Sequence, residues 1–176
     1  LKDLKELPKL VEQTLHTDNK IQTITNTFNE AKGSMFLGRG FSYPIALEGA
    51  LKLKELSYIH AEGYPAGEMK HGPLALIEEG MPVVVLAPRD NDYKKTISNM
   101  QEVIARGAKV LLITNKSKDE VVSENIWETL EVESTNEDLL PFLLTITLQK
   151  LAYYSALKKG FDIDKPRNLA KSVTVE

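Results

Sequence analysis

Two short apolar runs constrain the fold of this chain more than any other feature. Residues 82–87 read Pro-Val-Val-Val-Leu-Ala and residues 110–113 read Val-Leu-Leu-Ile, without the polar and apolar alternation of a half-exposed strand. Continuous runs of this length are typical of strands whose two faces are both covered. Since helices usually provide that cover, the runs predict a layered α/β protein built on a parallel sheet.

Helical and extended patterns alternate along the chain. The expected helices are residues 4–15, 18–32, 43–57, 90–107 and 137–159. The expected strands are residues 34–37, 58–61, 82–87, 109–114 and 127–132, with a loop-rich segment over residues 62–73. Because helices of about 12 or more residues join successive strands, parallel pairing with right-handed crossovers follows. We predict a doubly wound, mostly parallel five-stranded α/β sheet of flavodoxin type, with helices on both faces.

Local signals refine this outline. Thr17 or Asp18 is expected to cap the second helix and Asp90 the fourth, while Pro141 suits the first turn of the last helix. Sheets of this type bind ligands beyond the carboxyl ends of their strands, where residues 38–40 (Gly-Arg-Gly) would form a turn. This turn is no dinucleotide fingerprint, because a third glycine and a suitably spaced acidic residue are missing.

Composition sets outer limits on function. A chain of 176 residues with 42% hydrophobic content can form one core, so residues 1–176 are expected to be a single domain. A net charge of -3 without a basic stretch argues against nucleic-acid and anionic membrane partners. No run approaches the roughly 20 apolar residues of a membrane span. The absence of cysteine suits a cytosolic protein, and a first residue of leucine suggests a piece of a longer chain.

The helix over residues 43–57 carries a charged face. At helical spacing Glu48, Lys52 and Glu55 fall in one narrow stripe, whereas Ala46, Ala50 and Leu53 lie on the opposite side and can pack on the sheet. A solvated surface with ion pairs worth a few tenths of a kcal/mol would explain the stripe without any chemistry. Acid and amine groups on one surface are also what proton transfer requires, which is the alternative interpretation.

His71 stands in a glycine-flanked segment of the loop-rich region. An imidazole moves protons near neutral pH without help from its surroundings, so His71 is a candidate for general acid–base work. A surface histidine with no such role is the alternative. No histidines and carboxylates have metal-ligand spacing, so neither a metal nor a cofactor is expected.

The chain end contains a lysine that no secondary-structure pattern explains. Pro166 stops any helix, and Lys171 follows in a polar segment that must either dock or remain free. A lysine with its ordinary pKa has only roughly 0.04% neutral amine at pH 7, so nucleophilic work would require burial or cationic neighbours. Lys165 and Arg167 could supply that positive potential, and a solvated lysine in a frayed tail is the alternative.

Four motifs, in order, carry a resemblance that covers nearly the whole chain. They are residues 38–55 with the turn and the charged helix, His60-Ala61-Glu62, residues 70–76 around His71, and the tail over residues 166–176. The chain resembles the C-terminal half of the isomerase region in the glutamine:fructose-6-phosphate aminotransferases. The resemblance implies a sugar isomerase (SIS) domain, the second of two, with N-terminal helices over residues 1–32 and a substrate-covering tail over residues 161–176.

The resemblance also implies residue roles. Lys171 corresponds to the lysine that forms an imine with open-chain fructose 6-phosphate, and Glu55 to the glutamate that moves a proton between the first two sugar carbons. Lys52 corresponds to the lysine that handles the hydroxyl at the second carbon. His71 corresponds to the ring-opening histidine, which serves a neighbouring subunit's site. The backbone of Ala170 contacts substrate and Glu48 plays a supporting part.

The implied reaction makes glucosamine 6-phosphate for UDP-N-acetylglucosamine and cell-wall precursors. It requires a glutaminase domain and a first SIS domain whose serine- and threonine-rich loop holds the phosphate, so the fragment by itself is expected to be inactive. A cytoplasmic homodimer is the expected assembly. Two alternatives stay open, namely an SIS-type phosphosugar deglycase or isomerase and a sugar-phosphate-sensing module.

Overall fold

The fold is an alternation of strands and helices. The computed structural model describes residues 2–16, 18–117 and 125–167. The α-helices are α1 (Lys2–Leu15), α2 (Asp18–Glu30), α3 (Ser42–Ser57), α4 (Tyr93–Ile104) and α5 (Leu140–Lys158). Two 3-10 helices, η1 (Ala66–His71) and η2 (Pro73–Leu76), lie between α3 and the third strand. The strands are β1 (Ser34–Gly38), β2 (Ala61–Pro65), β3 (Pro82–Leu86), β4 (Lys109–Asn115) and β5 (Glu128–Val132).

The five strands form one parallel sheet in the order β2-β1-β3-β4-β5. The two apolar runs pair with each other at its centre, where Val85 lies beside Leu112. Strand order reverses between β1 and β3, which is the arrangement of a flavodoxin-like sheet. The predicted doubly wound parallel sheet is confirmed.

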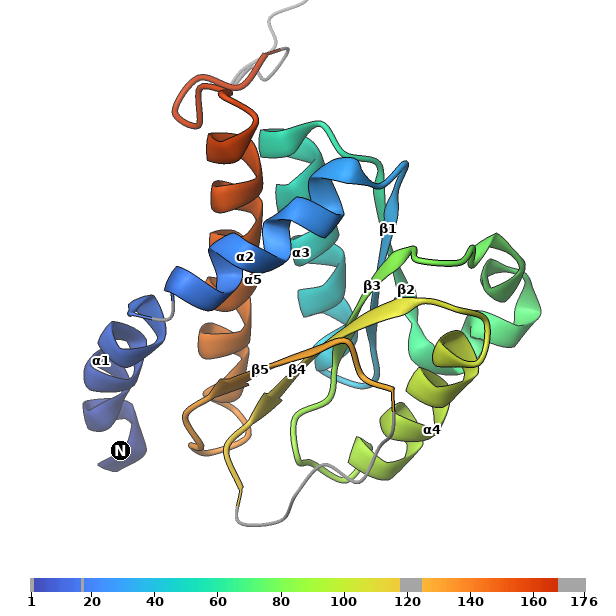
Figure 1. Ribbon diagram of the computed structural model, residues 1–176. Helices are drawn as coiled ribbons and strands as arrows, with labels where there is room; N and C mark the ends of the chain where they lie inside the picture. The colour runs from blue at the N-terminus through green and yellow to red at the C-terminus, as the bar shows by residue number, and fades with distance from the viewer. Residues whose placement is uncertain (1, 17, 118–124, 168–176) are drawn as a thin grey trace, which may run out of the picture.

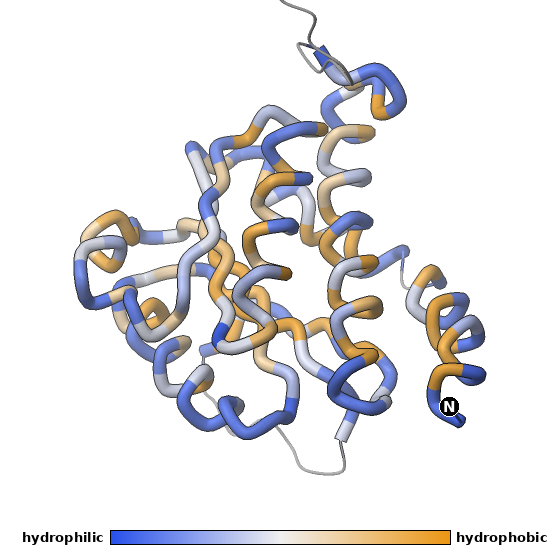
Figure 2. Tube along the Cα trace, turned by 180° about the vertical axis from the view of Figure 1, so that it is seen from behind, coloured by the Kyte–Doolittle hydropathy of each residue, from blue (hydrophilic) through white to orange (hydrophobic). Residues whose placement is uncertain are grey.

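Helices cover both faces of the sheet, because successive strand residues point to opposite sides. Phe36 and Val84 belong to a core cluster with α2, α3 and α5, whereas Met35 and Val83 belong to a second cluster with η1 and α4. Figure 1 shows α4 on one side of the sheet and α2, α3 and α5 on the other. Figure 2 shows hydrophobic residues concentrated along the central strands and the inner helix faces.

Helix α3 packs closely on the sheet and on α5. Ala46, Ala50 and Leu53 are buried in the larger core cluster, as the helical spacing predicts. A Cβ added at Gly49 would lie 2.6 Å from Cδ1 of Leu148, so no larger residue fits between α3 and α5 without movement. This packing fixes the orientation of the opposite, charged face of α3.

The prediction was wrong about where the second strand lies. The strand was expected over residues 58–61 but β2 covers Ala61–Pro65, and η1 and η2 occupy most of the remaining segment expected to be loop. Tyr58 explains the shift, since it adopts a left-handed conformation (φ 58°) and its N–H donates to the carbonyl of Lys54. That conformation ends α3 and delays the return to the sheet.

Other helix boundaries differ by a few residues. Asp90 does not cap α4 directly, because its carboxylate accepts from the backbone N–H of Asp92 and forms a turn before the helix. Pro141 lies in the first turn of α5 as predicted, and α2 begins at Asp18, while Thr17 lies outside the described residues. Across the described part of the chain, no helix combines the length and apolar character needed to cross a membrane.

Candidate functional site

The charged face of α3 forms a ladder of ion pairs. The Lys52 Nζ lies 2.7 Å from Glu55 Oε2 and 3.7 Å from Glu48 Oε1. The side chains of Lys52 and Glu55 are 29% and 22% exposed, so both remain open to a ligand from outside the domain. The structure therefore brings together the three helix residues that the sequence selects.

The ladder favours a charged lysine. Hydrogen bonding to Glu55 raises the pKa of Lys52, and the Glu48 carboxylate adds to this effect against the opposing effect of burial. Lys52 is therefore protonated near neutral pH and can donate a hydrogen bond to an oxygen. It is poorly suited to act as a nucleophile in this state.

The start of the C-terminal segment lies beside the end of α3. The Arg167 backbone N–H donates to the Tyr58 hydroxyl at 2.8 Å, and its guanidinium lies 4.1 Å from the centre of the Tyr58 ring. Phe161 packs on the same ring with centroids 4.7 Å apart. Lys159 donates to the Ser57 carbonyl at 3.3 Å. These contacts attach the segment at the amino ends of the strands, the end toward which Glu55 lies in the last turns of α3 (Figure 1).

The residues expected to form the imine and to cover the substrate lie outside the described residues. These are Lys171 and Ala170. Lys171 follows Arg167 by four positions along the chain, a stretch that spans at most about 14 Å when fully extended. Chain length alone thus limits how far Lys171 can lie from the Tyr58 anchor.

His71 lies away from the ladder. It ends η1, which follows the carboxyl end of β2, whereas Glu55 precedes the amino end of the same strand. The His71 side chain is 74% exposed, and Nδ1 lies 2.7 Å from Glu68 Oε2. Since a carboxylate only accepts hydrogen bonds, Nδ1 carries a proton in this contact, and the rest of the ring faces solvent. One domain therefore does not unite His71 with Lys52 and Glu55.

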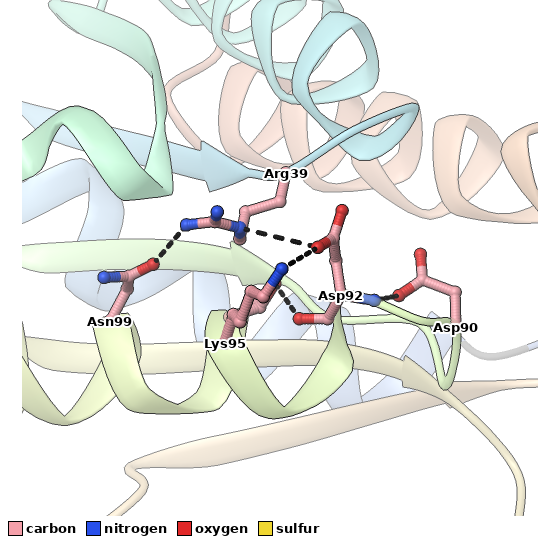
Figure 3. A network of polar contacts seen from close by, with 6 residues as sticks. Arg39, Asp90, Asp92, Lys95 and Asn99 are labelled. Atoms are coloured by element: carbon pink, nitrogen blue, oxygen red, sulfur yellow. Dashed lines mark hydrogen bonds and ion pairs between the residues drawn. The ribbon is translucent and has the colours of Figure 1, made fainter.

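The expected ligand position beyond the carboxyl end of β1 is occupied by the protein's own side chains. The Arg39 Nη1 donates to Asn99 Oδ1 at 3.1 Å, and Nε lies 3.9 Å from Asp92 Oδ1 (Figure 3). Lys95 also pairs with Asp92, at 3.5 Å. The turn over residues 38–40 lies where predicted, but its arginine is engaged with α4.

A pocket of about 500 Å³ opens elsewhere, at the amino ends of the strands. Its lining includes Ser34, His60, Met81 and Lys109, but none of the ladder residues nor His71. No cluster of three or more potential metal ligands occurs among the described residues. The candidate residues that the structure describes, Glu48, Lys52, Glu55 and His71, thus lie on open surfaces rather than in this pocket.

Comparison with known proteins identifies the family. A sequence model of the SIS domain matches residues 27–159. The chain belongs to the SIS domain family. The SIS domain is 52% identical over 176 residues to a Bartonella henselae protein named glutamine–fructose-6-phosphate aminotransferase (isomerizing), covering 100% of this chain and 29% of that protein. It is 53% identical over 173 residues to the protein of the same name from Aquifex aeolicus, covering 98% of this chain and 29% of that protein.

A solved structure agrees with the sequence relatives. The C-terminal domain of glucosamine-fructose-6-phosphate aminotransferase from Francisella tularensis superposes with a TM-score of 0.88 at 47% identity, over 93% of this chain and 46% of that chain. The SIS domain described here thus spans less than a third of the length of the curated relatives it matches.

Several polar contacts of this SIS domain escaped the sequence analysis. Tyr58 anchors the C-terminal segment, and the contact of Arg39 with Asn99 joins residues 60 positions apart, for which the sequence has no periodic signal. Glu62 accepts from the Tyr64 hydroxyl, which lowers the pKa of Glu62, and it lies 3.1 Å from His60 Nε2. Alternate residues on one strand face could have suggested the last group.

Proposed function

We propose that the chain is the second SIS domain of a glucosamine-6-phosphate synthase. In this proposal it carries the acid, base and imine-forming groups that convert fructose 6-phosphate and glutamine-derived ammonia to glucosamine 6-phosphate. The observation that carries the proposal is that the tail bearing Lys171 is attached, through Tyr58, three residues after Glu55. The named relatives, about half identical over the whole chain, supply the reaction class.

Each group has a distinct part in the proposed reaction. The neutral amine of Lys171 attacks the carbonyl carbon at position 2 of the open-chain sugar, and water leaves as the imine forms. Ammonia then displaces the lysine, leaving an imine of ammonia at the same carbon. The Glu55 carboxylate removes a proton from carbon 1 and returns it to carbon 2, which yields the 2-amino aldose.

The ladder and the tail position these groups. Lys52, held 2.7 Å from Glu55, donates to the oxygen at carbon 2 and orients the glutamate. Glu48, at 3.7 Å from Lys52, supports the ladder without touching the sugar. The backbone of Ala170 contacts substrate as the tail covers it.

Other parts of the parent protein complete the proposed site. Since the chain covers 29% of its relatives, we assign the ammonia source to a glutaminase domain and phosphate binding to a first SIS domain. His71 opens the sugar ring in the site of a neighbouring subunit of a homodimer. Binding energy from the phosphate would align the reacting carbons, so this SIS domain alone should turn over no substrate.

Trapping the imine tests the proposal. Borohydride reduction of the full-length enzyme with fructose 6-phosphate should leave a sugar adduct on the tail peptide that contains Lys171. Lys171→Arg should abolish both the adduct and synthesis, because a guanidinium is not deprotonated near neutral pH. Glutamine hydrolysis serves as the folding control. An adduct on Lys52 instead would overturn the assignment.

A further inference from the structure

The short helix that carries His71 depends on its surroundings for its position. Its inner side is fixed by Ala66 and Met69, which are fully buried between the sheet and α4. Its outer end carries the exposed His71, whose imidazole is bonded only within η1, to Glu68, among the contacts of the described residues. A six-residue 3-10 helix has little stability of its own. Contacts from other elements must therefore hold it in place.

Arg39 makes one such contact. A Cβ added at Gly67 would lie 2.6 Å from Arg39 Nη1 and 3.3 Å from Cζ, so the guanidinium rests directly on the backbone of η1. The same Nη1 donates to Asn99 Oδ1 at 3.1 Å. Figure 3 shows the Arg39 side chain reaching from the end of β1 to α4. Arg39 thus joins three elements, namely the β1–α3 turn, η1 and α4.

A second contact continues from the first. The Asn99 Nδ2 lies 3.5 Å from Glu102 Oε1, and the Lys70 Nζ lies 3.0 Å from the same oxygen. Asn99 and Glu102 are neighbours on one face of α4. Lys70 immediately precedes His71. The chain of contacts from Arg39 through α4 to Lys70 therefore fastens both the beginning and the end of η1.

We propose that Arg39 is a positioning residue for His71, holding η1 against α4 so that the imidazole stands where it opens the sugar ring. This inference rests on the proposed function. Proton transfer requires heavy atoms within about 2.6–3.2 Å of each other. Misplacement by about 1 Å can cost on the order of 10²-fold in rate. A loosened η1 would therefore impair ring opening and leave the chemistry at Lys52 and Glu55 intact.

A substrate analogue separates ring opening from the later steps. The ring of fructose 6-phosphate closes through the oxygen at carbon 5, so opening breaks the bond from that oxygen to carbon 2. A proton leaves the hydroxyl at carbon 2, and the oxygen at carbon 5 gains one. The 5-deoxy analogue of fructose 6-phosphate lacks that oxygen and exists only as the open chain. It therefore reaches imine formation without any need for His71.

The experiment compares the two substrates in the full-length enzyme. Arg39→Ala should lower kcat/KM for fructose 6-phosphate by about tenfold or more while the analogue changes by less than about twofold. His71→Ala should show the same selectivity with a larger loss. A smaller folded fraction would lower both rates equally, so the ratio reports positioning alone. Lys95→Ala is the matched control, since Lys95 pairs with the same Asp92 yet makes none of these contacts to η1, and both rates should stay unchanged.

Gly67→Ala approaches the same contact from the other side. The added methyl would displace the guanidinium, so this variant should reproduce part of the loss, and the Arg39→Ala/Gly67→Ala double variant should lose no more than Arg39→Ala. If His71→Ala impairs only fructose 6-phosphate but Arg39→Ala impairs both substrates equally, or neither, the positioning role of Arg39 is overturned. Equal losses in His71→Ala would overturn the ring-opening assignment itself, and the inference with it.

Discussion

The two ends of the parallel sheet hold their polar side chains in different ways. Toward the amino ends of the strands, Lys52 and Glu55 pair with each other on the outer face of α3 and remain partly exposed. Beyond the carboxyl ends, Arg39 is bound between Asp92 and Asn99 and rests on η1. The first group is open to an outside ligand, whereas the second is committed to internal contacts.

This difference shows that the usual rule for doubly wound sheets does not locate the Lys52–Glu55 pair. Such sheets bind ligands at the carboxyl edge, where the strand order reverses. In this SIS domain an arginine makes internal contacts at that edge, whereas the Lys52–Glu55 pair lies on a helix face toward the other end. A helix face offers no enclosure of its own, and in the function we propose the first SIS domain completes the pocket.

The largest expected effect tests the amino-end ladder. Glu55→Gln in the full-length enzyme should reduce sugar isomerisation by roughly 10²–10⁴-fold, because an amide cannot carry the proton between the two carbons. Glu48→Gln, which removes the longer 3.7 Å ion pair, should cost only about twofold, as expected for a few tenths of a kcal/mol. Steady-state glucosamine 6-phosphate formation measures both, with glutamine hydrolysis as the control. Equal loss of activity in the two variants would mean that Glu55 serves only as an ion-pair partner of Lys52 and does not carry the proton.

The next prediction concerns the separation of His71 from Glu55. If His71 serves the partner's site, a hybrid dimer of one His71→Ala and one Lys171→Arg subunit contains one intact site and one doubly damaged site. Such hybrids, purified through two different affinity tags, should recover roughly half of wild-type activity. A site built within one subunit would leave both pockets singly damaged and the hybrid nearly inactive. That result would mean that His71 does not serve the partner's site.

Much of this arrangement could be predicted from the sequence because it rests on local periodicity. The two apolar runs indicate central strands, and a spacing of four and then three residues places Glu48, Lys52 and Glu55 on one face. Both inferences need only neighbouring residues. The tail and its Lys171 were selected through a family resemblance, and that part of the site stays a prediction.

The rest could not be predicted because it depends on contacts between distant segments or on unusual conformations. Tyr58 adopts a left-handed conformation that is normally marked by glycine, so β2 was expected three residues too early. The bond from Arg39 to Asn99 forms only once the fold brings the turn after β1 to α4. Such contacts follow from the tertiary fold and leave no pattern in the sequence.

The smallest expected effect concerns the charge of Lys52. The hydrogen bond that Lys52 donates to Glu55 raises the pKa of Lys52 above its ordinary value of 10.5. This stabilisation is complete below that value and is lost as the pH rises through the raised pKa. At neutral pH, Glu55→Gln should lower the free energy of unfolding by about 0.3–0.5 kcal/mol. The loss should vanish in strong alkali, where the lysine is neutral in both proteins. Urea unfolding at several pH values, with an NMR titration of the Lys52 side chain, measures this.

The matched control is Glu48→Gln. It should lower the pKa of Lys52 by less than Glu55→Gln does, because the ion pair that it removes is longer. A larger effect from Glu48→Gln would show that Glu55 is not the main partner of Lys52, and its carboxylate would then be free to turn away from the ladder.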